Sequence, residues 1–362
     1  MNADARPVLI MAGGTGGHVY PALAVARALL AQRVPVLWLG TRSGLEGRVV
    51  PAAGIPIEWL SISGLRGKGL LALFVPFKLL FACLQAARII LRTRPRIVLG
   101  MGGYVAAPGG LACKLLMKPL VIHEQNAVAG FTNRLLSKLA NSVLQAFPNT
   151  FKPELNAYHT GNPVREDIAN IPLPDLRLAE RKGRLRVLVI GGSQGSSFLN
   201  EIMPRAIATM PSSAWPQVRH QAGQGHLQAT QQSYKSKDID AEVTTFIDDM
   251  AAAYAWADIA VCRSGAMTVA ELAAAGLPSI LVPFPHAVDD HQTRNARFLA
   301  DKGAAILAPQ PTLRAETLGD WLSELGVDRR RLLRMAQSAR TLARLDATRL
   351  VVRECLAVAE SY

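Results

Sequence analysis

Two glycine-rich segments carry the strongest chemical signal in the sequence. Gly13–Gly17 follows the apolar run Val8–Ala12, and Gly191–Gly195 follows the apolar run Val187–Ile190, each just ahead of a helix-like stretch. Glycine lets a backbone approach a bound group closely, and amide N–H groups at the beginning of a helix attract anions. The first segment therefore predicts a ligand contact and the second a diphosphate site, with an ordinary tight turn as the alternative for each.

The first segment departs from the dinucleotide fingerprint Gly-x-Gly-x-x-Gly, because its third glycine is displaced. In addition, no acidic residue ends the second apolar run, Val36–Gly40, which continues into Thr41 and Arg42. An acidic residue at that place would hold the ribose of NAD. These departures argue against NAD, and Arg42 alone is a weak argument for NADP.

His18 directly follows the first glycine segment. Doubly wound sheets bind ligands at the carboxyl ends of their strands, and His18 is expected beside such an end. An imidazole accepts a hydroxyl proton near neutral pH, so His18 is a candidate general base. The alternative is a structural histidine or a helix cap.

A second candidate is Glu271, which lies three residues after Thr268 on an expected helix, Thr268–Ala275, that follows Arg263–Ala266. Residues three apart lie on one helix face. The carboxylate could hold both hydroxyls of a ribose, or it could form a capping box with Thr268. The sequence pattern alone does not separate the two.

The sequence gives little support for a metal site or for disulfide bonds. The four cysteines are scattered without a Cys-x-x-Cys pair, which indicates neither a zinc site nor a disulfide framework and fits a reducing compartment. Histidines and acids occur together between Pro283 and Gln292, but the sole Asp-x-Asp, Asp238 to Asp240, lies in a charged, loop-like stretch. No required metal is predicted.

The interval between Glu58 and Glu124 contains no acidic residue. Its cations are Arg66, Lys68, Lys78, Arg88, Arg92, Arg94, Arg96, Lys114 and Lys118, interleaved with Leu70, Leu71, Leu73, Phe74, Phe77, Leu80 and Phe81. Large apolar groups beside unopposed cations favour an anionic lipid surface. The alternative is a core helix with a solvated basic face. The apolar part is too interrupted for a transmembrane helix, and no nucleic-acid-binding module is present.

The 362 residues and their 50% hydrophobic content suit two globular domains, and the net charge of +13 indicates an anionic partner. The strand–glycine–helix unit occurs twice, which predicts two doubly wound domains. Further strands are expected at Ile97–Gly100, Leu120–His123, Val243–Ile247, Ile259–Val261 and Ser279–Val282. Asn170–Leu185 is expected to be an exposed loop, and Asp328–Glu360 to be helical throughout.

Taken together, the motifs resemble the MurG family, the UDP-N-acetylglucosamine transferases of peptidoglycan synthesis. The matching blocks, in family order, are Gly13–His18, Gly64–Gly69, Gly100–Tyr104, His123–Asn126, Gly161–Arg165, Gly191–Gly195, Arg263–Ala266 and Pro283–Gln292. They span nearly the whole chain. One block alone would be weak, whereas eight in order are specific.

The resemblance implies an α/β protein of the GT-B fold, with two Rossmann-like domains facing across a deep cleft. It implies an acceptor and membrane-associating domain at 1–164, a UDP-GlcNAc-binding domain at 165–342, and a C-terminal helix, 343–362, packed on the first domain. The implied reaction is inverting transfer of GlcNAc from UDP-GlcNAc to the 4-hydroxyl of the muramoyl sugar of lipid I, giving lipid II. The implied setting is the cytoplasmic face of the inner membrane, with cell-wall synthesis complexes as partners and no cofactor, metal or nucleic acid.

The resemblance also assigns site residues. His18 is the candidate base, and Thr15, Gly16, Gly17 and Asn126 complete the first domain's part. The donor side comprises Arg165, Ser193, Ile247, Ala266, Met267, Thr268, Glu271 and Gln292. Arg165 and Ser193 would face nucleotide or phosphates, Glu271 the ribose, the Ile247 backbone the uracil, Ala266, Met267 and Thr268 the phosphate side, and Gln292 the sugar. Some family members carry a glutamine pair where this chain has His291-Gln292.

Two kinds of rival function stay open at this level. One is another enzyme on the same fold, either a UDP-GlcNAc 2-epimerase or a transferase with a different acceptor. The basic apolar interval argues for the lipid acceptor. The other rival is a nucleotide-sugar binding protein without turnover.

Overall fold

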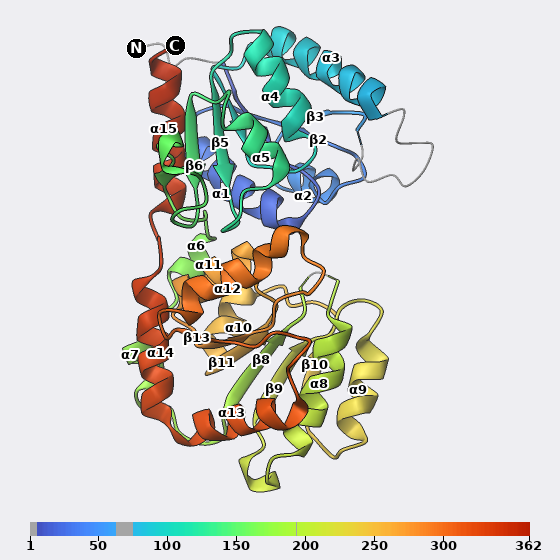
Figure 1. Cartoon of the computed structure of the whole chain (residues 1–362), viewed down its shortest axis with the longest axis vertical. Coiled ribbons are helices and arrows are strands. Elements are labelled where there is room, and N and C mark those ends of the chain that lie inside the picture. Colours follow the sequence, from blue (N-terminus) through green and yellow to red (C-terminus); the bar gives the residue numbers. More distant parts are fainter. Residues whose placement is uncertain (1–5, 63–74, 193) are drawn as a thin grey trace. The chain divides into compact units, whose positions relative to one another are not determined.

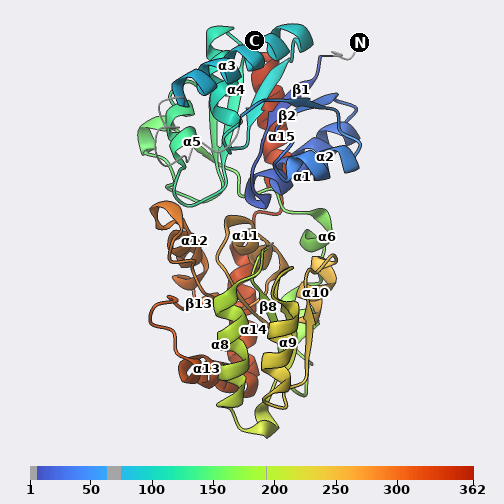
Figure 2. The same ribbon diagram turned by 90° about the vertical axis from the view of Figure 1, so that its right-hand side faces the viewer.

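The computed structural model describes residues 6–62, 75–192 and 194–362. The chain forms two compact units. Unit 1 comprises Met1–Val164 with Leu345–Tyr362, and unit 2 comprises Arg165–Arg344. Each unit is a parallel sheet covered by helices (Figure 1; Figure 2).

The sheet of unit 1 has the strand order β3-β2-β1-β4-β5-β6-β7. Its strands are β1 Val8–Met11, β2 Val36–Gly40, β3 Ile57–Trp59, β4 Ile97–Gly100, β5 Leu120–Glu124, β6 Ser142–Gln145 and β7 Tyr158–His159. All neighbours pair in parallel. Strands β1 and β4, at the middle of the sheet, are apolar and fully buried because helices cover both faces of the sheet.

Helices pack on both faces of this sheet. They are α1 Gly16–Ala31, α2 Glu46–Ala52, α3 Val75–Thr93, α4 Ala106–Leu115, α5 Phe131–Leu136 and α15 Ala347–Glu360, with a 3₁₀ turn, η2, at Pro153–Leu155. One core joins β1, β2 and β4 to α1 and α15. The other joins the opposite sheet face to α3 and α4. The C-terminal helix α15 packs against α1 and supplies Val351, Val352 and Cys355 to the first core.

The sheet of unit 2 has the order β10-β9-β8-β11-β12-β13, again all parallel. Its strands are β8 Arg186–Ile190, β9 Gln217–Gln221, β10 Ala241–Thr244, β11 Ile259–Cys262, β12 Ser279–Leu281 and β13 Ala305–Leu307. Its helices are α6 Glu166–Ala169, α7 Pro174–Leu178, α8 Ser197–Ala208, α9 Leu227–Lys235, α10 Met250–Trp256, α11 Ala266–Ala275, α12 His291–Ala300, α13 Ala315–Val327 and α14 Arg329–Thr341, with 3₁₀ turns η3 Ser212–Ala214 and η4 Val288–Asp290.

Three expectations about elements are wrong. The last stretch is not one helix, because α14 ends at Thr341 and α15 begins at Ala347. The break coincides with the passage from unit 2 to unit 1, where the two helices pack on different cores. The strand expected at Val243–Ile247 lies earlier, at Ala241–Thr244, so Ile247 belongs to the following loop.

The third error concerns Asn170–Leu185, which contains α7 rather than only exposed loop. Arg177 donates to the carbonyls of Tyr254, Ala275 and Gly276, each at 2.8 Å. Arg181 donates to the carbonyls of Ala255 and Trp256 at 3.1 and 2.7 Å. The last carbonyls of a helix lack partners within it, so these guanidinium groups cap α11 and α10. The charged residues Arg177 and Arg181 suggest an exposed loop in the sequence, but in the structure they bond helix ends within unit 2.

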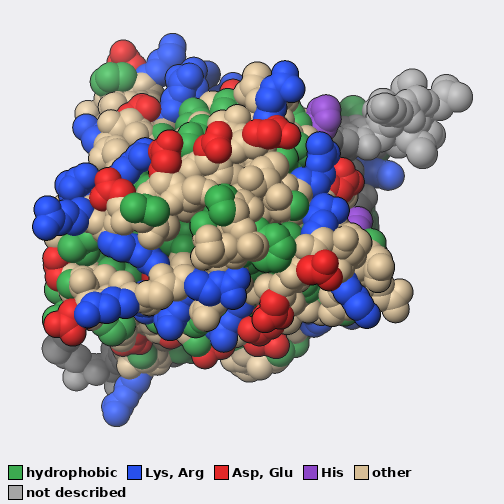
Figure 3. Space-filling model, turned by 90° about the horizontal axis from the view of Figure 1, so that it is seen from below, with side chains coloured by type: hydrophobic (Ala, Val, Ile, Leu, Met, Phe, Trp, Pro, Cys, Tyr) green, Lys and Arg blue, Asp and Glu red, His purple; other side chains and the backbone are tan. Residues whose placement is uncertain are grey.

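The surface in Figure 3 shows Lys and Arg side chains interspersed with Asp and Glu. On the face shown, the cationic side chains are therefore not gathered into one basic patch. Among the described residues, no helix combines the length and apolar character needed to cross a bilayer.

Candidate active site

The glycine segments lie where the strand order reverses in each sheet. In unit 1 the chain runs outward from β1 to β3 and then returns to β4 on the other side of β1; in unit 2 it does the same around β8 and β11. Loops at the carboxyl ends of these neighbouring strands diverge to opposite faces and leave room for a ligand. Gly13–Gly17 follows β1, and Gly191–Gly195 follows β8, so both occupy such a position.

His18 lies in the first turn of α1, with its backbone N–H on the Thr15 carbonyl. Its ring is half-buried, and Nδ1 lies 2.9 Å from Oε1 of Gln125, which follows β5. Gly102, after β4, sits against the same ring: a Cβ at this glycine would lie 2.7 Å from Nδ1. Three strand ends thus converge on one imidazole. Gln125 was not among the expected site residues, although it lies within the His123–Asn126 block.

The glycine loop itself is held by Glu46, the first residue of α2, which is fully buried. Its carboxylate accepts from the Gly14 N–H at 3.0 Å and from the N–H and hydroxyl of Thr41 at 2.9 and 2.8 Å. A buried carboxylate needs such donors, and it fixes their positions in return. Thr15, Gly16 and Gly17 therefore start from an anchored turn. The sequence pattern gave no signal for Glu46.

Asn126 is anchored in the same way by its neighbour Glu124, which is 2% exposed. Oε1 of Glu124 accepts from the backbone N–H and the side-chain amide of Asn126 at 2.9 and 3.2 Å. Its Oε2 accepts from Gly130 and Asn133. The loop after β5, which carries both Gln125 and Asn126, is therefore shaped around one carboxylate.

We expect Gly103→Ala to destabilise unit 1 strongly. Gly103 has a φ of +80°, and an added Cβ would lie 2.2 Å from the Gly13 carbonyl oxygen, so the loops after β1 and β4 would have to separate. Gly54 is the matched control, since its φ is +71° but nothing lies within 4 Å of an added Cβ. Thermal unfolding should show a loss of about 1 kcal/mol for Gly54→Ala from the left-handed backbone alone, and of at least about 3 kcal/mol for Gly103→Ala. Equal losses would refute the close approach.

In unit 2, the segment Gly191–Gly195 leads into α8. Ser193 lies outside the described residues. Around it, the Gly192 carbonyl accepts from the side chain of Gln221 at 3.1 Å and from the Gly195 N–H at 2.9 Å, and Ser196 caps α8 by accepting from Leu199 N–H. The described glycines on either side of Ser193 are thus hydrogen-bonded, and they precede the positive end of a 12-residue helix, which favours anionic groups.

Glu271 lies on α11 and does not form a capping box. The N-cap of α11 is Gly265 with no side-chain cap, and Thr268 is already inside the helix. Instead, Oε2 of Glu271 accepts from the Tyr254 hydroxyl at 3.0 Å, and Oε1 lies 3.9 Å from the Arg165 guanidinium. Burial raises the pKa of Glu271, while Arg165 and the Tyr254 hydrogen bond act to lower it. The carboxylate is therefore oriented by Tyr254, a residue that sequence reasoning missed.

Ala266, Met267 and Thr268 form the first turn of α11, immediately after β11. Beside them, Arg263 donates to the carbonyls of Val282 and Pro283 at 3.1 and 3.2 Å, and its guanidinium lies over the ring of Phe284. Arg263 thereby ties the loop after β12 to the end of β11.

Gln292 is the second residue of α12, which begins at the end of this loop. Its Oε1 accepts from the Phe284 N–H at 2.9 Å. That bond uses the carbonyl oxygen and directs the amide group, so the N–H donors of Gln292 are the part left to meet a ligand. His291, its neighbour, is half-buried.

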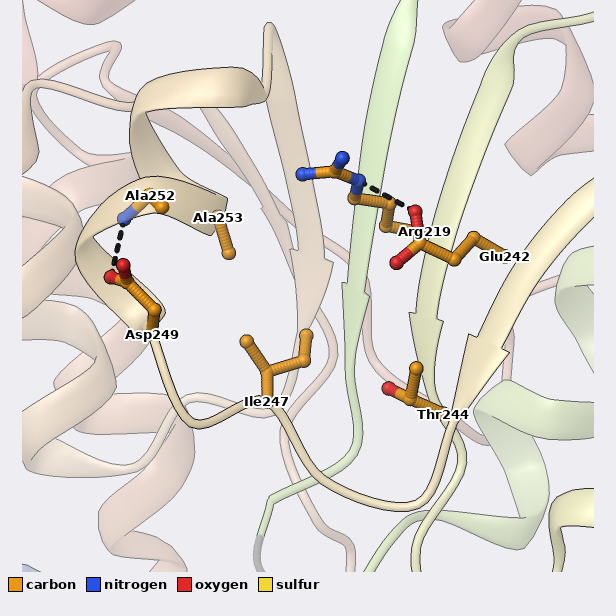
Figure 4. A pocket seen from close by; sticks show the side chains of 7 residues that line it. All are labelled: Arg219, Glu242, Thr244, Ile247, Asp249, Ala252 and Ala253. Carbon is orange, nitrogen blue, oxygen red and sulfur yellow. Dashed lines mark hydrogen bonds and ion pairs between the residues drawn. The ribbon is translucent and has the colours of Figure 1, made fainter.

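Ile247 lies in the loop between β10 and α10 and points into a cavity of about 200 Å³ (Figure 4). The cavity is lined by Arg219, Glu242, Thr244, Ile247, Asp249, Ala252 and Ala253. Asp249 caps α10 by accepting from Ala252 N–H at 2.8 Å, and Arg219 pairs with Glu242 at 2.9 Å. The side chain of Ile247 occupies this cavity. A ligand at the end of the strand would therefore meet the Ile247 backbone.

The structure thus groups the expected residues by unit. In unit 1, Thr15 is the N-cap of α1 and Gly16, Gly17 and His18 form its first turn, just after β1, while Asn126 lies in the loop after β5. In unit 2, the described donor-side residues lie at the N-cap of α6, on α11 and α12, and in the loop after β10. Within the described ranges, no three or more His, Cys, Asp or Glu side chains are placed to share a metal ion.

Comparison with known families and relatives covers almost the entire chain. Residues 8–145 match the glycosyltransferase family 28 N-terminal domain, and residues 186–351 match the glycosyltransferase family 28 C-terminal domain. A relative from Alkalilimnicola ehrlichii is 56% identical over 97% of this chain and 98% of its own length. One from Marinobacter nauticus is 53% identical over 98% of each. Both are named UDP-N-acetylglucosamine–N-acetylmuramyl-(pentapeptide) pyrophosphoryl-undecaprenol N-acetylglucosamine transferase.

Among solved structures, the chain is similar to MurG of Acinetobacter baumannii, with a TM-score of 0.85 and 43% identity over 97% of this chain and 99% of that one. The expected fold class, α/β with two Rossmann-like doubly wound domains of the GT-B fold, is confirmed. The eight motif blocks and these full-length matches agree, and the chain belongs to the MurG family of glycosyltransferase family 28.

Proposed function

We propose that the protein transfers GlcNAc from UDP-GlcNAc to the 4-hydroxyl of the muramoyl sugar of lipid I, with inversion at the anomeric carbon, and so produces lipid II. The observation that carries this proposal is full-length identity of 51–56% to transferases named for this donor and acceptor. The site supports it with a glycine-lined helix end in unit 2 and an oriented imidazole in unit 1.

The reaction first requires that the negative charge on the departing UDP be stabilised. Glycosyl transfer passes through an oxocarbenium-like state while negative charge grows on the leaving diphosphate. The backbone amides of Gly191–Gly195, the positive end of α8 and the Arg165 guanidinium are the groups assigned to stabilise that charge. Arg165 is 32% exposed at its side chain, so its charge is accessible to a ligand.

Donor recognition is assigned to the remaining residues of unit 2. Glu271 accepts from the ribose hydroxyls, and its existing bond to Tyr254 holds the carboxylate in one orientation. The Ile247 backbone meets the uracil, the turn Ala266–Thr268 meets the phosphate side, and the Gln292 amide donates to sugar hydroxyls. Each of these groups lies at the carboxyl edge of the sheet or on a helix that begins there.

The acceptor hydroxyl needs a base, and we assign this role to His18. Its Nδ1 faces Gln125, and among the described residues Nε2 has no hydrogen-bond partner of its own. Nε2 is therefore the ring atom assigned to take the proton as the hydroxyl attacks C1 of GlcNAc. Thr15, Gly16, Gly17 and Asn126 are assigned to shape the acceptor side around it.

Product analysis distinguishes this function from its rivals. The protein is mixed with UDP-GlcNAc and a short-chain lipid I analogue, and the products are identified by mass spectrometry. Lipid II analogue and UDP in equal amounts are expected. An epimerised UDP-sugar without acceptor would indicate the 2-epimerase, and donor binding without any product would indicate a binding protein; either outcome contradicts the proposal.

We further propose that the protein works at the cytoplasmic surface of the inner membrane and contacts anionic lipid through α3. This helix exposes large apolar side chains along its length: Phe77, Leu80, Phe81, Leu84 and Leu91, each between 54% and 71% exposed. Leu115 and Met117, near the end of α4, are 78% and 79% exposed, and α4 packs on α3. Lys78, Arg88 and Lys114 lie on these same two helices, and Arg92 is paired with Glu58. The expected residues Arg66, Lys68 and Leu70–Phe74 lie outside the described ranges.

The double substitution Phe77→Ser with Phe81→Ser should weaken binding to vesicles that contain phosphatidylglycerol by at least about tenfold, since fully burying each phenyl group contributes about 1.5–3 kcal/mol. Co-sedimentation measures the partition. Leu176→Ser with Val327→Ser is the matched control, because these unit 2 residues are 81% and 87% exposed. An equal loss of vesicle binding in the two double variants would contradict the assigned surface. Equal binding of the unaltered protein to neutral and anionic vesicles would contradict it as well.

A further inference from the structure

A chain of hydrogen bonds runs from His18 into the interior of unit 1. Nδ1 of His18 lies 2.9 Å from Oε1 of Gln125, and Nε2 of Gln125 lies 3.1 Å from Nδ1 of His123. Nε2 of His123 lies 3.0 Å from the Gly161 carbonyl oxygen and 3.2 Å from the Thr160 hydroxyl. Gln125 is 1% exposed and His123 is 0% exposed, so water cannot replace these partners.

The inner end of the chain has a fixed direction. A carbonyl oxygen only accepts, so the bond to Gly161 places a hydrogen on Nε2 of His123. The Thr160 hydroxyl donates to the same carbonyl at 3.0 Å, which leaves its oxygen free to accept from His123 as well. Burial lowers the pKa of His123 to about 4, outweighing the Gly161 bond and the charge of Glu124, which act to raise it. A neutral ring with its hydrogen on Nε2 presents a lone pair at Nδ1.

A second backbone carbonyl fixes the orientation of Gln125. Its Nε2 lies 3.1 Å from the carbonyl oxygen of His123 as well as 3.1 Å from Nδ1 of that ring. Both neighbours are acceptors, so the NH₂ group must face them. A flipped amide would place its oxygen against two acceptors, without a hydrogen bond to either. Oε1 of Gln125 therefore faces His18.

The same donor and acceptor argument fixes the position of the hydrogen at the outer end of the chain, on the His18 ring. An amide oxygen accepts, so Nδ1 of His18 carries the hydrogen in the bond to Gln125. In a neutral imidazole the other nitrogen then holds the lone pair. We infer that Gln125 and His123 are positioning residues that lock His18 in its Nδ1–H tautomer and make Nε2 the proton-accepting atom. This inference rests on the proposed role of His18 as the base.

The tautomer is measured directly by long-range ¹H–¹⁵N correlation spectra of the full chain labelled at histidine, with the His18 ring assigned by its loss in His18→Ala. The unaltered protein is expected to show a protonated Nδ1 and a bare Nε2 for His18. Gln125→Met keeps a side chain of similar shape and removes all three side-chain hydrogen bonds, to His18 Nδ1, His123 Nδ1 and the His123 carbonyl. It should give a mixture of the two His18 tautomers, and it should lower kcat at least about tenfold with little change in KM for UDP-GlcNAc.

Gln145→Met is the matched control. Gln145 is also a buried glutamine of unit 1; its side chain bonds backbone groups of Ala157, Thr150 and Phe151 and makes no hydrogen bond to His18. It should lower stability in a similar way while the His18 signals stay those of one tautomer.

A bare Nδ1 in the unaltered protein, or one unchanged tautomer in Gln125→Met, overturns the inference. Neither result depends on turnover. Loss of the proposed function would instead appear as the absence of lipid II product from the unaltered protein, whatever its His18 spectrum shows.

Discussion

Replacing His18 with alanine is expected to lower kcat about 10²- to 10⁴-fold, the range that a general base contributes, and to leave KM for UDP-GlcNAc within about threefold. The physical reason is that His18 acts on the acceptor hydroxyl, whereas the donor contacts are assigned to unit 2. The ring is half-buried beside Gly102 and Gln125, so its loss removes a proton acceptor without opening the core. Steady-state kinetics with varied donor and a short-chain lipid I analogue measure both constants.

His159→Ala is the control for this change. His159 is another half-buried histidine of unit 1, on β7, and its Nε2 bonds the Ala146 carbonyl at 3.0 Å. It is not assigned to the site, so kcat should stay within about threefold. A His18→Ala enzyme that turns over at the rate of His159→Ala would remove His18 from the mechanism.

The second large effect is expected from Glu271→Ala, which should raise the Kd and KM for UDP-GlcNAc about 10- to 150-fold and leave kcat at saturating donor nearly unchanged. Hydrogen bonds to a charged group contribute about 1.5–3 kcal/mol, and each 1.4 kcal/mol is tenfold in affinity. The substitution also leaves the buried Tyr254 hydroxyl and the half-buried Arg165 guanidinium without their shared partner. Isothermal titration with UDP-GlcNAc gives Kd apart from turnover.

Glu324→Ala is the matched control, since Glu324 forms an exposed ion pair with Arg331 in the same unit. Exposed pairs contribute little, so donor affinity should not change. If Glu271→Ala and His18→Ala gave the same pattern of kcat and KM, the assigned division between donor binding and proton transfer would be wrong.

Much of the fold could be predicted because parallel strands that are buried on both faces appear in the sequence as short apolar runs. β1, β2, β4, β8 and β11 all appear this way, and the glycines that follow β1 and β8 mark the switch points. The error at Asn170–Leu185 has a physical cause. Arg177 and Arg181 look like solvent-exposed charges, but they cap helix ends far away in sequence, and no local pattern reveals such partners.

In the candidate site, too, the residues marked by a local sequence pattern could be predicted, and those that act through distant contacts could not. His18 and Glu271 could be singled out because they stand beside a glycine loop or on a helix after a strand. Glu46, Gln125 and Tyr254, which orient the loop, the imidazole and the carboxylate, could not. Each of them acts through a contact between residues distant in sequence: 32 residues from Glu46 to Gly14, 107 from Gln125 to His18 and 17 from Tyr254 to Glu271.

The account depends most on where the leaving diphosphate binds. A crystal structure of the protein soaked with UDP tests this directly. The account predicts both phosphates at the end of β8, within hydrogen-bond distance of backbone amides of residues 191–195 at the beginning of α8, with the ribose hydroxyls on Glu271. Phosphates bound elsewhere in the molecule, with these amides facing only solvent, would contradict it.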